Sequence, residues 1–149
     1  MHQLDDFTRA YVKAMLWSTT NDKTDYHFDR DFDASDFTFE SMAAIIEECA
    51  WFQQEYAEHI GTRWKDAGHD FWLTREGHGC GFCDGDWGDP AATVLNDACK
   101  ELFRENAQVW EENGELHYQS YWLDRHREEL KQATYPPINK DRIIDLGDL

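Results

Sequence analysis

Positive charge, long apolar runs and the motifs of the common catalytic chemistries are all scarce in this 149-residue chain. It holds 14 Lys and Arg against 31 Asp and Glu, a formal net charge of −17, and a surface of that sign repels phosphate. Direct binding to nucleic acid or to an anionic membrane is therefore not expected. No apolar run approaches the roughly 20 residues of a membrane helix, and no basic segment followed by an apolar one opens the chain, so neither a membrane span nor a signal peptide is predicted. These shortages point to a cytoplasmic protein whose surface attracts basic partners.

Sequence signatures of catalysis are missing as well. The chain has no Gly-rich phosphate loop, no Gly-x-Ser-x-Gly elbow and no His-Glu-x-x-His helix. His69, Asp70 and His78 are the candidates for acid–base work. Adjacent residues of a strand point to opposite faces, so His69 and Asp70 are not expected to form a dyad. The sequence predicts no catalytic residue and no cofactor.

Metal ligands are incomplete in the same way. Cys80 and Cys83 have the spacing of half a zinc site, but a structural site takes four ligands, normally from two such pairs. Residues 84–89 begin like a calcium loop, but Gly and Leu stand where an EF-hand needs its later ligands. Cys49 and Cys99 fall on apolar stripes of predicted helices, where a thiol packs as a small hydrophobe. We expect no metal and four free thiols.

Apolar side chains at three- and four-residue steps predict four amphipathic helices, over residues 4–17, 38–60, 89–103 and 120–133. The helix over 38–60 is the clearest, with Thr38 as its N-cap, a stripe from Phe39 to Ile60, and Gly61 at its end. The third helix is expected to open at Asp89-Pro90, with Asp as N-cap and Pro at the first helical position. Aromatic residues make up 15% of the chain, enough to fill a core between these helices.

Two hairpins are predicted between the helices. Residues 69–75 and 80–84 have the aromatic and β-branched content of strands, with a turn at 76–79 between them. Residues 108–112 and 115–119 flank Asn113-Gly114, the pair typical of a two-residue hairpin turn. The predicted fold class is α+β, with two antiparallel β-hairpins in one four-stranded sheet and helices packed on one face. Residues 1–120 are expected to form a single α+β domain, and residues 121–149 a C-terminal helix and tail.

The block over residues 67–75, together with Gly77-His78-Gly79 and Gly81-Phe82, resembles a family of small acidic, mostly phage-encoded proteins of unknown function. The resemblance covers roughly residues 5–118. It implies a phage gene product that acts in the host cytoplasm, and it carries no activity with it. Relatives commonly have a small residue and an aromatic at the positions of Cys80 and Cys83, so a shared cysteine-based function is not implied.

Residues 18–37 lose the helical period and form an acidic loop, whose carboxylates are the predicted partner-binding site: Asp22, Asp25, Asp29, Asp31, Asp33 and Asp36. Phe28, Phe32 and Phe37 are expected to fix the loop to the body. On an extended segment, Asp29, Asp31 and Asp33 would share one face at a spacing of about 6.7 Å and would stand in for a phosphate backbone. Exposed Trp or Tyr nearby would supply anchors.

The sequence therefore predicts an acidic phage protein that binds and inhibits a host nucleic-acid-handling system, of the restriction or CRISPR type, as a DNA mimic. The expected partner is a host protein with a basic nucleic-acid-binding groove. Two alternatives stay open. One is a small hydrolase-like enzyme that uses His69, Asp70 and His78, and the other is a structural or regulatory phage protein whose acidity is incidental.

Overall fold

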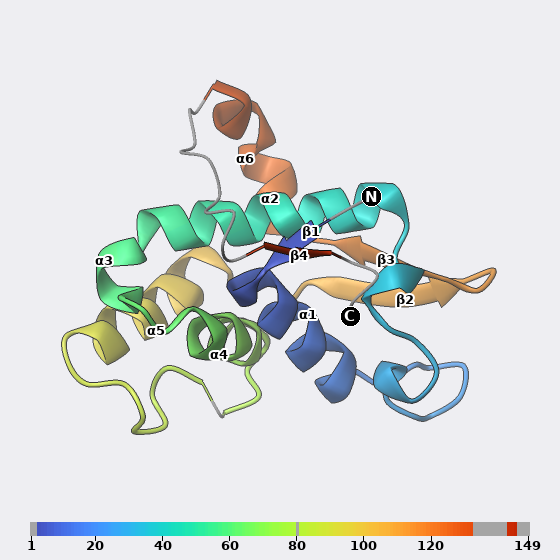
Figure 1. The fold of residues 1–149 in the computed structure, drawn as a ribbon, viewed down its shortest axis with the longest axis horizontal. Coiled ribbons are helices and arrows are strands. Elements are labelled where there is room, and N and C mark those ends of the chain that lie inside the picture. Colours follow the sequence, from blue (N-terminus) through green and yellow to red (C-terminus); the bar gives the residue numbers. More distant parts are fainter. Residues whose placement is uncertain (1–2, 80, 133–142, 146–149) are drawn as a thin grey trace.

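A computed structural model describes residues 3–79, 81–132 and 143–145 of the chain. Within these ranges the protein is α+β, with six α-helices, two short 3-10 helices and two pairs of antiparallel strands (Figure 1). The helices are α1 (Asp6–Ser18), α2 (Phe39–Glu55), α3 (Ala57–Ile60), α4 (Trp64–Glu76), α5 (Ala91–Leu102) and α6 (Tyr121–Gln132). The strands are β1 (Gln3–Asp5), β2 (Gln108–Glu112), β3 (Glu115–Gln119) and β4 (Ile143–Asp145), and the 3-10 helices are η1 (Phe28–Arg30) and η2 (Ala34–Asp36).

The predicted hairpin over residues 108–119 is confirmed. β2 pairs with β3 from Gln108 opposite Gln119 to Glu112 opposite Glu115. Asn113 and Gly114 both have positive φ, 54° and 83°, as the two central residues of a type I′ turn require. The turn residues therefore fixed both the position and the register of this hairpin.

The predicted hairpin over residues 69–84 is wrong, and with it the four-stranded sheet. Residues 64–76 form α4, and the chain from Gly81 to Pro90 consists of turns and bends without a strand. The buried residues of α4 include Ala67, Phe71 and Arg75, which recur at the four-residue step of a helix. Gly77, taken as part of a hairpin turn, is the left-handed residue that ends α4, where the N–H of His78 donates to the carbonyl of Leu73. The aromatic run was typical of a strand, but its burial has a helical period.

Among the described elements, helices α1 and α4 contact each other more extensively than any other pair. Asp5 caps α1 by accepting a hydrogen bond from the N–H of Thr8. A Cβ placed on Gly68 of α4 would stand 2.0 Å from the carbonyl oxygen of Phe7, so only glycine permits this approach. The Tyr11 ring then packs edge-on against Trp72 and tilted against Phe71.

The long helix predicted over residues 38–60 is interrupted. Thr38 caps it as expected, but α2 ends at Glu55, Tyr56 leaves the helical region, and α3 ends before Gly61. Phe39, the first member of the predicted stripe, is 71% exposed, while the middle of the stripe is buried. Phe39 therefore points away from the core, whereas Ser41 and Met42 of the same turn are buried.

Helices α5 and α6 lie close to the predicted ranges. α5 begins at Ala91 with Pro90 as its N-cap, so the predicted Asp89 cap is one residue early, and the Asp89 carboxylate accepts instead from the hydroxyl of Thr93. In α6 the Trp122 ring packs against Trp51 and Phe103, with ring centroids 4.4 and 5.0 Å away. The predicted stop at Pro136-Pro137 lies outside the described residues.

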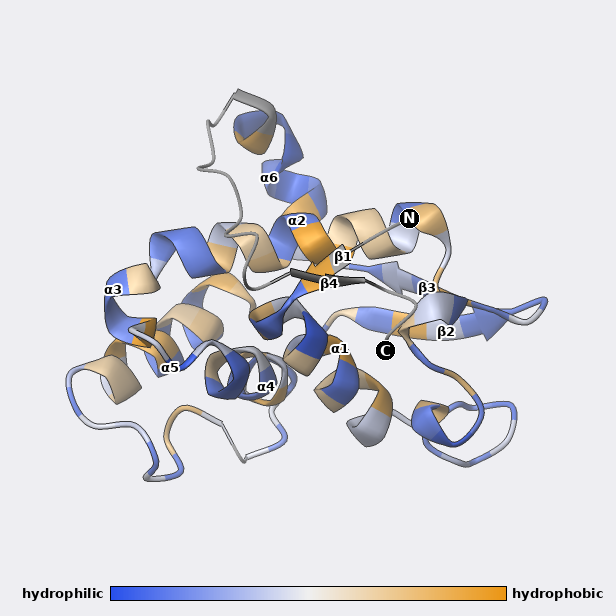
Figure 2. Cartoon of the chain, in the orientation of Figure 1, coloured by the Kyte–Doolittle hydropathy of each residue, from blue (hydrophilic) through white to orange (hydrophobic). Residues whose placement is uncertain are grey.

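The ends of the described chain meet at β1 and β4, where Gln3 pairs with Asp145 and Asp5 with Ile143 (Figure 1). The apolar residues of the helices gather toward the interior, and the outer helix faces are polar (Figure 2). The hairpin contributes Leu116 and Tyr118 to the core. No helix among the described residues is long and apolar enough to cross a membrane.

Candidate functional site

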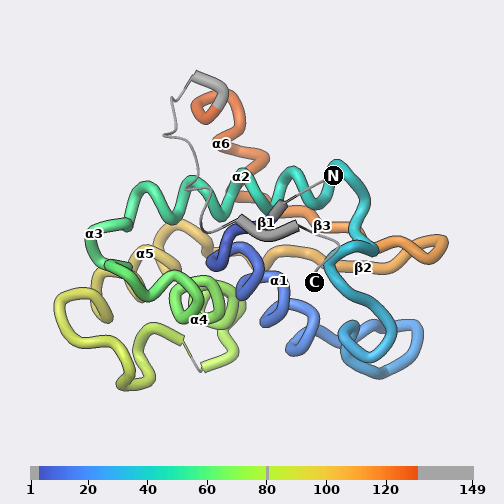
Figure 3. The backbone as a smooth tube through the Cα atoms, in the orientation of Figure 1, coloured from blue at the N-terminus to red at the C-terminus, as the bar shows by residue number. Residues whose placement is uncertain are grey.

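The acidic loop leaves the helical body after α1 and returns to it at the start of α2 (Figure 3). It is folded, not extended. Thr20 forms a β-bridge with His27, and η1 and η2 follow. Phe28, Ala34 and Phe37 are buried and Phe32 packs half-buried against the core, so the predicted fixing of the loop by its phenylalanines is confirmed. Phe37 also bridges to Leu116 of β3, which connects the loop to the hairpin.

The expected extended row of Asp29, Asp31 and Asp33 is not what the loop forms. Asp29 lies inside η1, and Asp31 follows it in a helical backbone conformation. The Asp33 carboxylate caps η2 by accepting from the N–H of Ser35, and Asp36 accepts from the N–H of Asp33 at 2.8 Å. A capping box of this kind stabilises the turn, so these carboxylates are not evenly spaced along a strand.

The six predicted aspartates divide into two groups. Asp31 pairs with Arg30 at 2.8 Å, and Asp33 and Asp36 bond within the capping box. Asp22, Asp25 and Asp29 are exposed, and their carboxylates have no hydrogen bond or ion pair among the described residues. The second group is therefore the part of the loop whose charge is open to a partner.

Both basic residues of the loop are already engaged. Lys23 reaches Glu111 of β2, with Nζ 2.5 Å from the carboxylate. Arg30 pairs with Asp31 and lies over the Tyr26 ring, with its guanidinium carbon 3.6 Å from the ring centroid. The Lys23 pair ties the loop to the hairpin, and the Arg30 pair lies within the loop.

Two large aromatic side chains flank the acidic carboxylates. Trp17 at the end of α1 is 55% exposed, and Tyr26 in the loop is 56% exposed. Exposed aromatic rings are enriched among the residues that dominate binding energy at interfaces. They are exposed aromatic residues of the kind that the sequence-based hypothesis requires.

A groove of about 340 Å³ runs between α1 and the loop. Trp17, Leu16 and Phe32 supply apolar wall, and Asp29 stands at the rim. Arg9 also lines it, and its Nε atom is buried without a hydrogen-bond partner among the described residues. The groove is an apolar recess whose charged lining is mixed, with Arg9 and Lys13 from α1 and Asp29 and Asp33 from the loop.

A buried polar cluster that the sequence did not predict lies at the centre of the fold. Arg75 of α4 and Glu48 of α2 form an ion pair whose side chains are fully inaccessible to solvent. The hydroxyls of Tyr11 and Tyr118 lie 2.7 Å apart and contact the same carboxylate, and Ser120 donates to its second oxygen. Burial raises the pKa of both tyrosines, so their hydroxyls stay protonated and available to donate.

This cluster joins α1, α2, α4 and β3 through buried side chains, so it holds these elements together. Its sequence signal was weak. Glu48 lies beside Cys49 in the buried face of α2, and Arg75 follows the block Phe71–Leu73 at helical spacing once α4 is recognised as a helix.

His69 and Asp70, which were not expected to form a dyad, do form one because they lie on a helix. Nδ1 of His69 is 3.0 Å from Oδ1 of Asp70, and Oδ2 accepts from the indole N–H of Trp87 at 2.7 Å. Burial raises the pKa of Asp70, and the bonds to His69 and Trp87 oppose that effect. The dyad fixes the loop around Trp87 to α4, whereas His78 lies beyond the helix end, where its backbone N–H closes the turn.

The cysteines are distributed as the helical stripes predicted where the structure describes them. Cys49 and Cys99 are buried free thiols, and burial raises the pKa of both. Cys83 is exposed, and Cys80 lies outside the described residues. No group of three or more His, Cys, Asp or Glu residues that could hold a metal ion occurs within the described part of the chain.

Comparison with known proteins gives no match to a family model, to a curated protein sequence or to a solved structure. The resemblance to acidic phage proteins therefore stays a prediction.

Proposed function

We propose that this chain is a binding protein that engages a positively charged partner protein through the acidic loop and the groove beside it. The observation that carries the proposal is the way the loop is presented. Its apolar residues Phe28 and Phe37 are buried, while Asp22, Asp25 and Asp29 are exposed and their carboxylates have no partner among the described residues. A preformed loop loses little conformational entropy on binding, so its charge contributes to affinity and to association rate.

The groove and the two exposed aromatics complete such a surface. Interfaces depend on a few apolar anchors in the middle of a polar rim. Here the apolar wall of Trp17 and Phe32 lies next to Asp29, and Tyr26 lies further along the loop. A basic partner that inserts an apolar side chain into this groove would meet carboxylates on the loop side, at Asp29 and Asp33, and the cations Arg9 and Lys13 on the α1 side.

The partner class that this charge favours is a protein whose own ligand is a nucleic acid, because its binding groove is already lined with Lys and Arg. Occupation of that groove would inhibit the partner, and a host restriction or CRISPR-type effector, met by a phage product in the host cytoplasm, is the specific form of the proposal. The inhibition rests on charge and anchors. It does not rest on a DNA-like spacing of carboxylates, since η1 and η2 replace the extended row.

The experiment is affinity capture of the partner, followed by association kinetics with charge variants. Asp22→Asn, Asp25→Asn and Asp29→Asn are combined in one variant, because these carboxylates make no bond that the fold would lose. We expect the association rate with the captured partner to fall by about tenfold or more at low ionic strength, and the difference to shrink as salt screens the charges.

The matched control removes the same charge from the opposite end of the molecule. Glu58→Gln, Asp97→Asn and Glu101→Gln change exposed residues of α3 and α5, which lie far from the loop (Figure 1). If the two triple variants slow association equally, net charge alone is responsible and the loop is not the binding surface. Wild-type kinetics in the loop variant would equally remove the proposal.

A further inference from the structure

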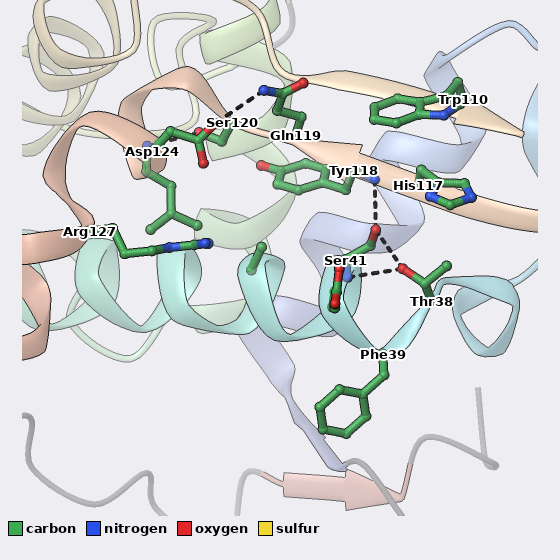
Figure 4. A pocket seen from close by; sticks show the side chains of 13 residues that line it. Thr38, Phe39, Ser41, Trp110, His117, Tyr118, Gln119, Ser120, Asp124 and Arg127 are labelled. Carbon is green, nitrogen blue, oxygen red and sulfur yellow. Dashed lines mark hydrogen bonds between the residues drawn. The ribbon is translucent and has the colours of Figure 1, made fainter.

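A second cavity, the α2–β3–α6 cleft, lies on a part of the molecule that the proposed function does not use. Its volume is about 590 Å³, within the range of sites that hold small organic molecules. The first turns of α2 and α6 and the end of β3 form its walls, and Trp110 reaches it from β2. In Figure 4, Trp110 and His117 lie at one end of the cleft, and Asp124 and Arg127 at the other.

The floor of the cleft is rigidly held. Ser41 accepts a hydrogen bond from the backbone N–H of Tyr118 at 3.0 Å, and the Thr38 hydroxyl bonds both the hydroxyl and the N–H of Ser41. Ser120 and Tyr118 are fixed from behind by the carboxylate of Glu48. The cleft therefore exists before a ligand arrives, which lowers the entropy cost of binding.

One end of the cleft is a planar aromatic surface. Trp110 and His117 are opposite each other on β2 and β3, and their rings stack with centroids 5.3 Å apart at 11°. The indole is 39% exposed, so the stack stays open to solvent. An aromatic ring of a ligand can extend such a stack irrespective of its exact chemistry.

The other end of the cleft carries the guanidinium of Arg127. The Arg127 side chain extends from α6 toward α2 (Figure 4), and it has no ion pair among the described residues, in a chain with about two acids for every base. Arg125, two residues earlier on the same helix, does pair with Glu105 at 2.8 Å. A guanidinium is a fork of donors suited to a carboxylate or a phosphate.

The two carboxylates that line the cleft have roles in their own helices. Glu40 and Asp124 lie in the first turns of α2 and α6, where negative charge stabilises the positive helix end. Asp124 also accepts a hydrogen bond from the side-chain amide of Gln119 at 3.2 Å. Neither is paired with Arg127, so the guanidinium remains available to a ligand.

We infer that the α2–β3–α6 cleft binds a small aromatic molecule that carries an anionic group, with its ring on Trp110 and His117 and its carboxylate or phosphate at Arg127. This site is separate from the acidic loop and does not depend on the proposed function. The net negative charge of the chain opposes anions only at long range, and that repulsion is screened beyond about 8 Å at physiological salt.

The test titrates four probes into the isotope-labelled full chain. Binding is measured by NMR from the chemical shifts of the backbone amides. Indole-3-acetate and tryptamine share a ring but carry opposite charges, and adenosine monophosphate and adenosine differ by the phosphate. We expect the two anions to shift signals around His117 and Arg127, with dissociation constants of about 1 mM or tighter. Tryptamine and adenosine should bind at least about tenfold more weakly. The stronger of the two anions tells whether carboxylate or phosphate is preferred.

Two variants locate the binding. Arg127→Gln should weaken both anions by about tenfold, and Trp110→Ala should weaken them to a similar extent. Arg125→Gln, which changes an arginine of the same helix that has its own partner, should leave binding unchanged. The inference is overturned by any of three results: tryptamine binding as tightly as indole-3-acetate, wild-type affinity in Arg127→Gln, or no binding of either anion at millimolar concentration.

Discussion

Glu48 and Arg75 carry opposite charges inside a core from which water is excluded. Burying one of these ions alone would be strongly unfavourable, and the attraction between the two charges offsets the loss of hydration of both. The two tyrosine hydroxyls and Ser120 add the hydrogen bonds that such a pair needs. Because the members come from distant segments, the cluster requires these segments to meet in one arrangement.

We expect Arg75→Met to lower the free energy of unfolding by about 3–5 kcal/mol, because it leaves the Glu48 carboxylate buried without its counter-ion. Adding Glu48→Met to that variant should recover part of the loss, since both charges are then gone. Urea denaturation measures both effects. Arg125→Met, which breaks an exposed pair with Glu105, serves as control and should change stability by less than about 1 kcal/mol. A double variant as unstable as the sum of its parts would contradict the coupling.

Glu76 makes stability depend on pH. Burial raises the pKa of its carboxyl to about 7, although Arg75 and the N–H of Ala107 favour the charged form. The folded state thus holds this proton more tightly than the unfolded chain. The contribution is favourable below the ordinary pKa of 4.5 and is lost as the pH rises through about 7.

We expect the wild-type protein to lose stability relative to Glu76→Gln between about pH 5 and pH 8, by on the order of 1–3 kcal/mol. Glutamine keeps the neutral shape at every pH, so the difference between the two proteins isolates this one carboxyl from the many others. Urea midpoints at several pH values provide the measurement. Parallel pH profiles of the two proteins would show that Glu76 is ionised normally in the folded state.

At the scale of elements, α1 and α4 approach each other more closely than most side chains allow. Gly68 has the conformation of a helix interior, where alanine is the better helix former by about 1 kcal/mol. Its place against the backbone of Phe7 reverses that preference, because the methyl group of alanine has no room. Helix propensity and packing therefore predict opposite signs for the same substitution.

We expect Gly68→Ala to destabilise the protein by about 2 kcal/mol or more, since the overlap is with backbone that cannot rotate away. Gly88→Ala is the control, because Gly88 lacks a positive φ and a Cβ there meets nothing within 4 Å. Thermal unfolding of both variants distinguishes the two effects. A Gly68→Ala protein as stable as the wild type would mean that α1 and α4 are further apart than described.

At the scale of the whole molecule, the net charge of −17 affects stability. Repulsion among so many carboxylates destabilises any compact state, and added salt screens it. The exposed carboxylates of Asp22, Asp25 and Asp29 add to this repulsion, and among the described residues they make no bond that offsets it. A surface kept at this cost is consistent with a binding role.

We expect the melting temperature to rise when NaCl is increased from about 10 mM to about 300 mM, because the screening length falls from roughly 30 Å to less than 8 Å. The variant that combines Asp22→Asn, Asp25→Asn and Asp29→Asn should melt higher than the wild type at low salt, and the difference should close at high salt. Calorimetry at a series of salt concentrations gives the comparison. A triple variant that melts lower at low salt would show that these carboxylates have stabilising partners.

Local signals in the sequence determined the hairpin at Asn113-Gly114 and the cap at Thr38, because each depends on the conformational preference of one or two residues. The same signals located the acidic loop, its phenylalanine contacts and its open charge. The candidate surface was thus predictable in composition, although its 3-10 turns were not, since the capping box of Asp33 and Asp36 competes locally with an extended chain.

Only the tertiary structure decided the rest. Residues 69–75 have the composition of a strand, but the close approach at Gly68 and the buried charge of Arg75 select a helix. The ion pair of Glu48 with Arg75 and the α2–β3–α6 cleft join residues far apart in the chain, and no local preference encodes such a meeting. Contacts of this kind arise from packing the elements together, because the free energy that fixes them belongs to several segments at once.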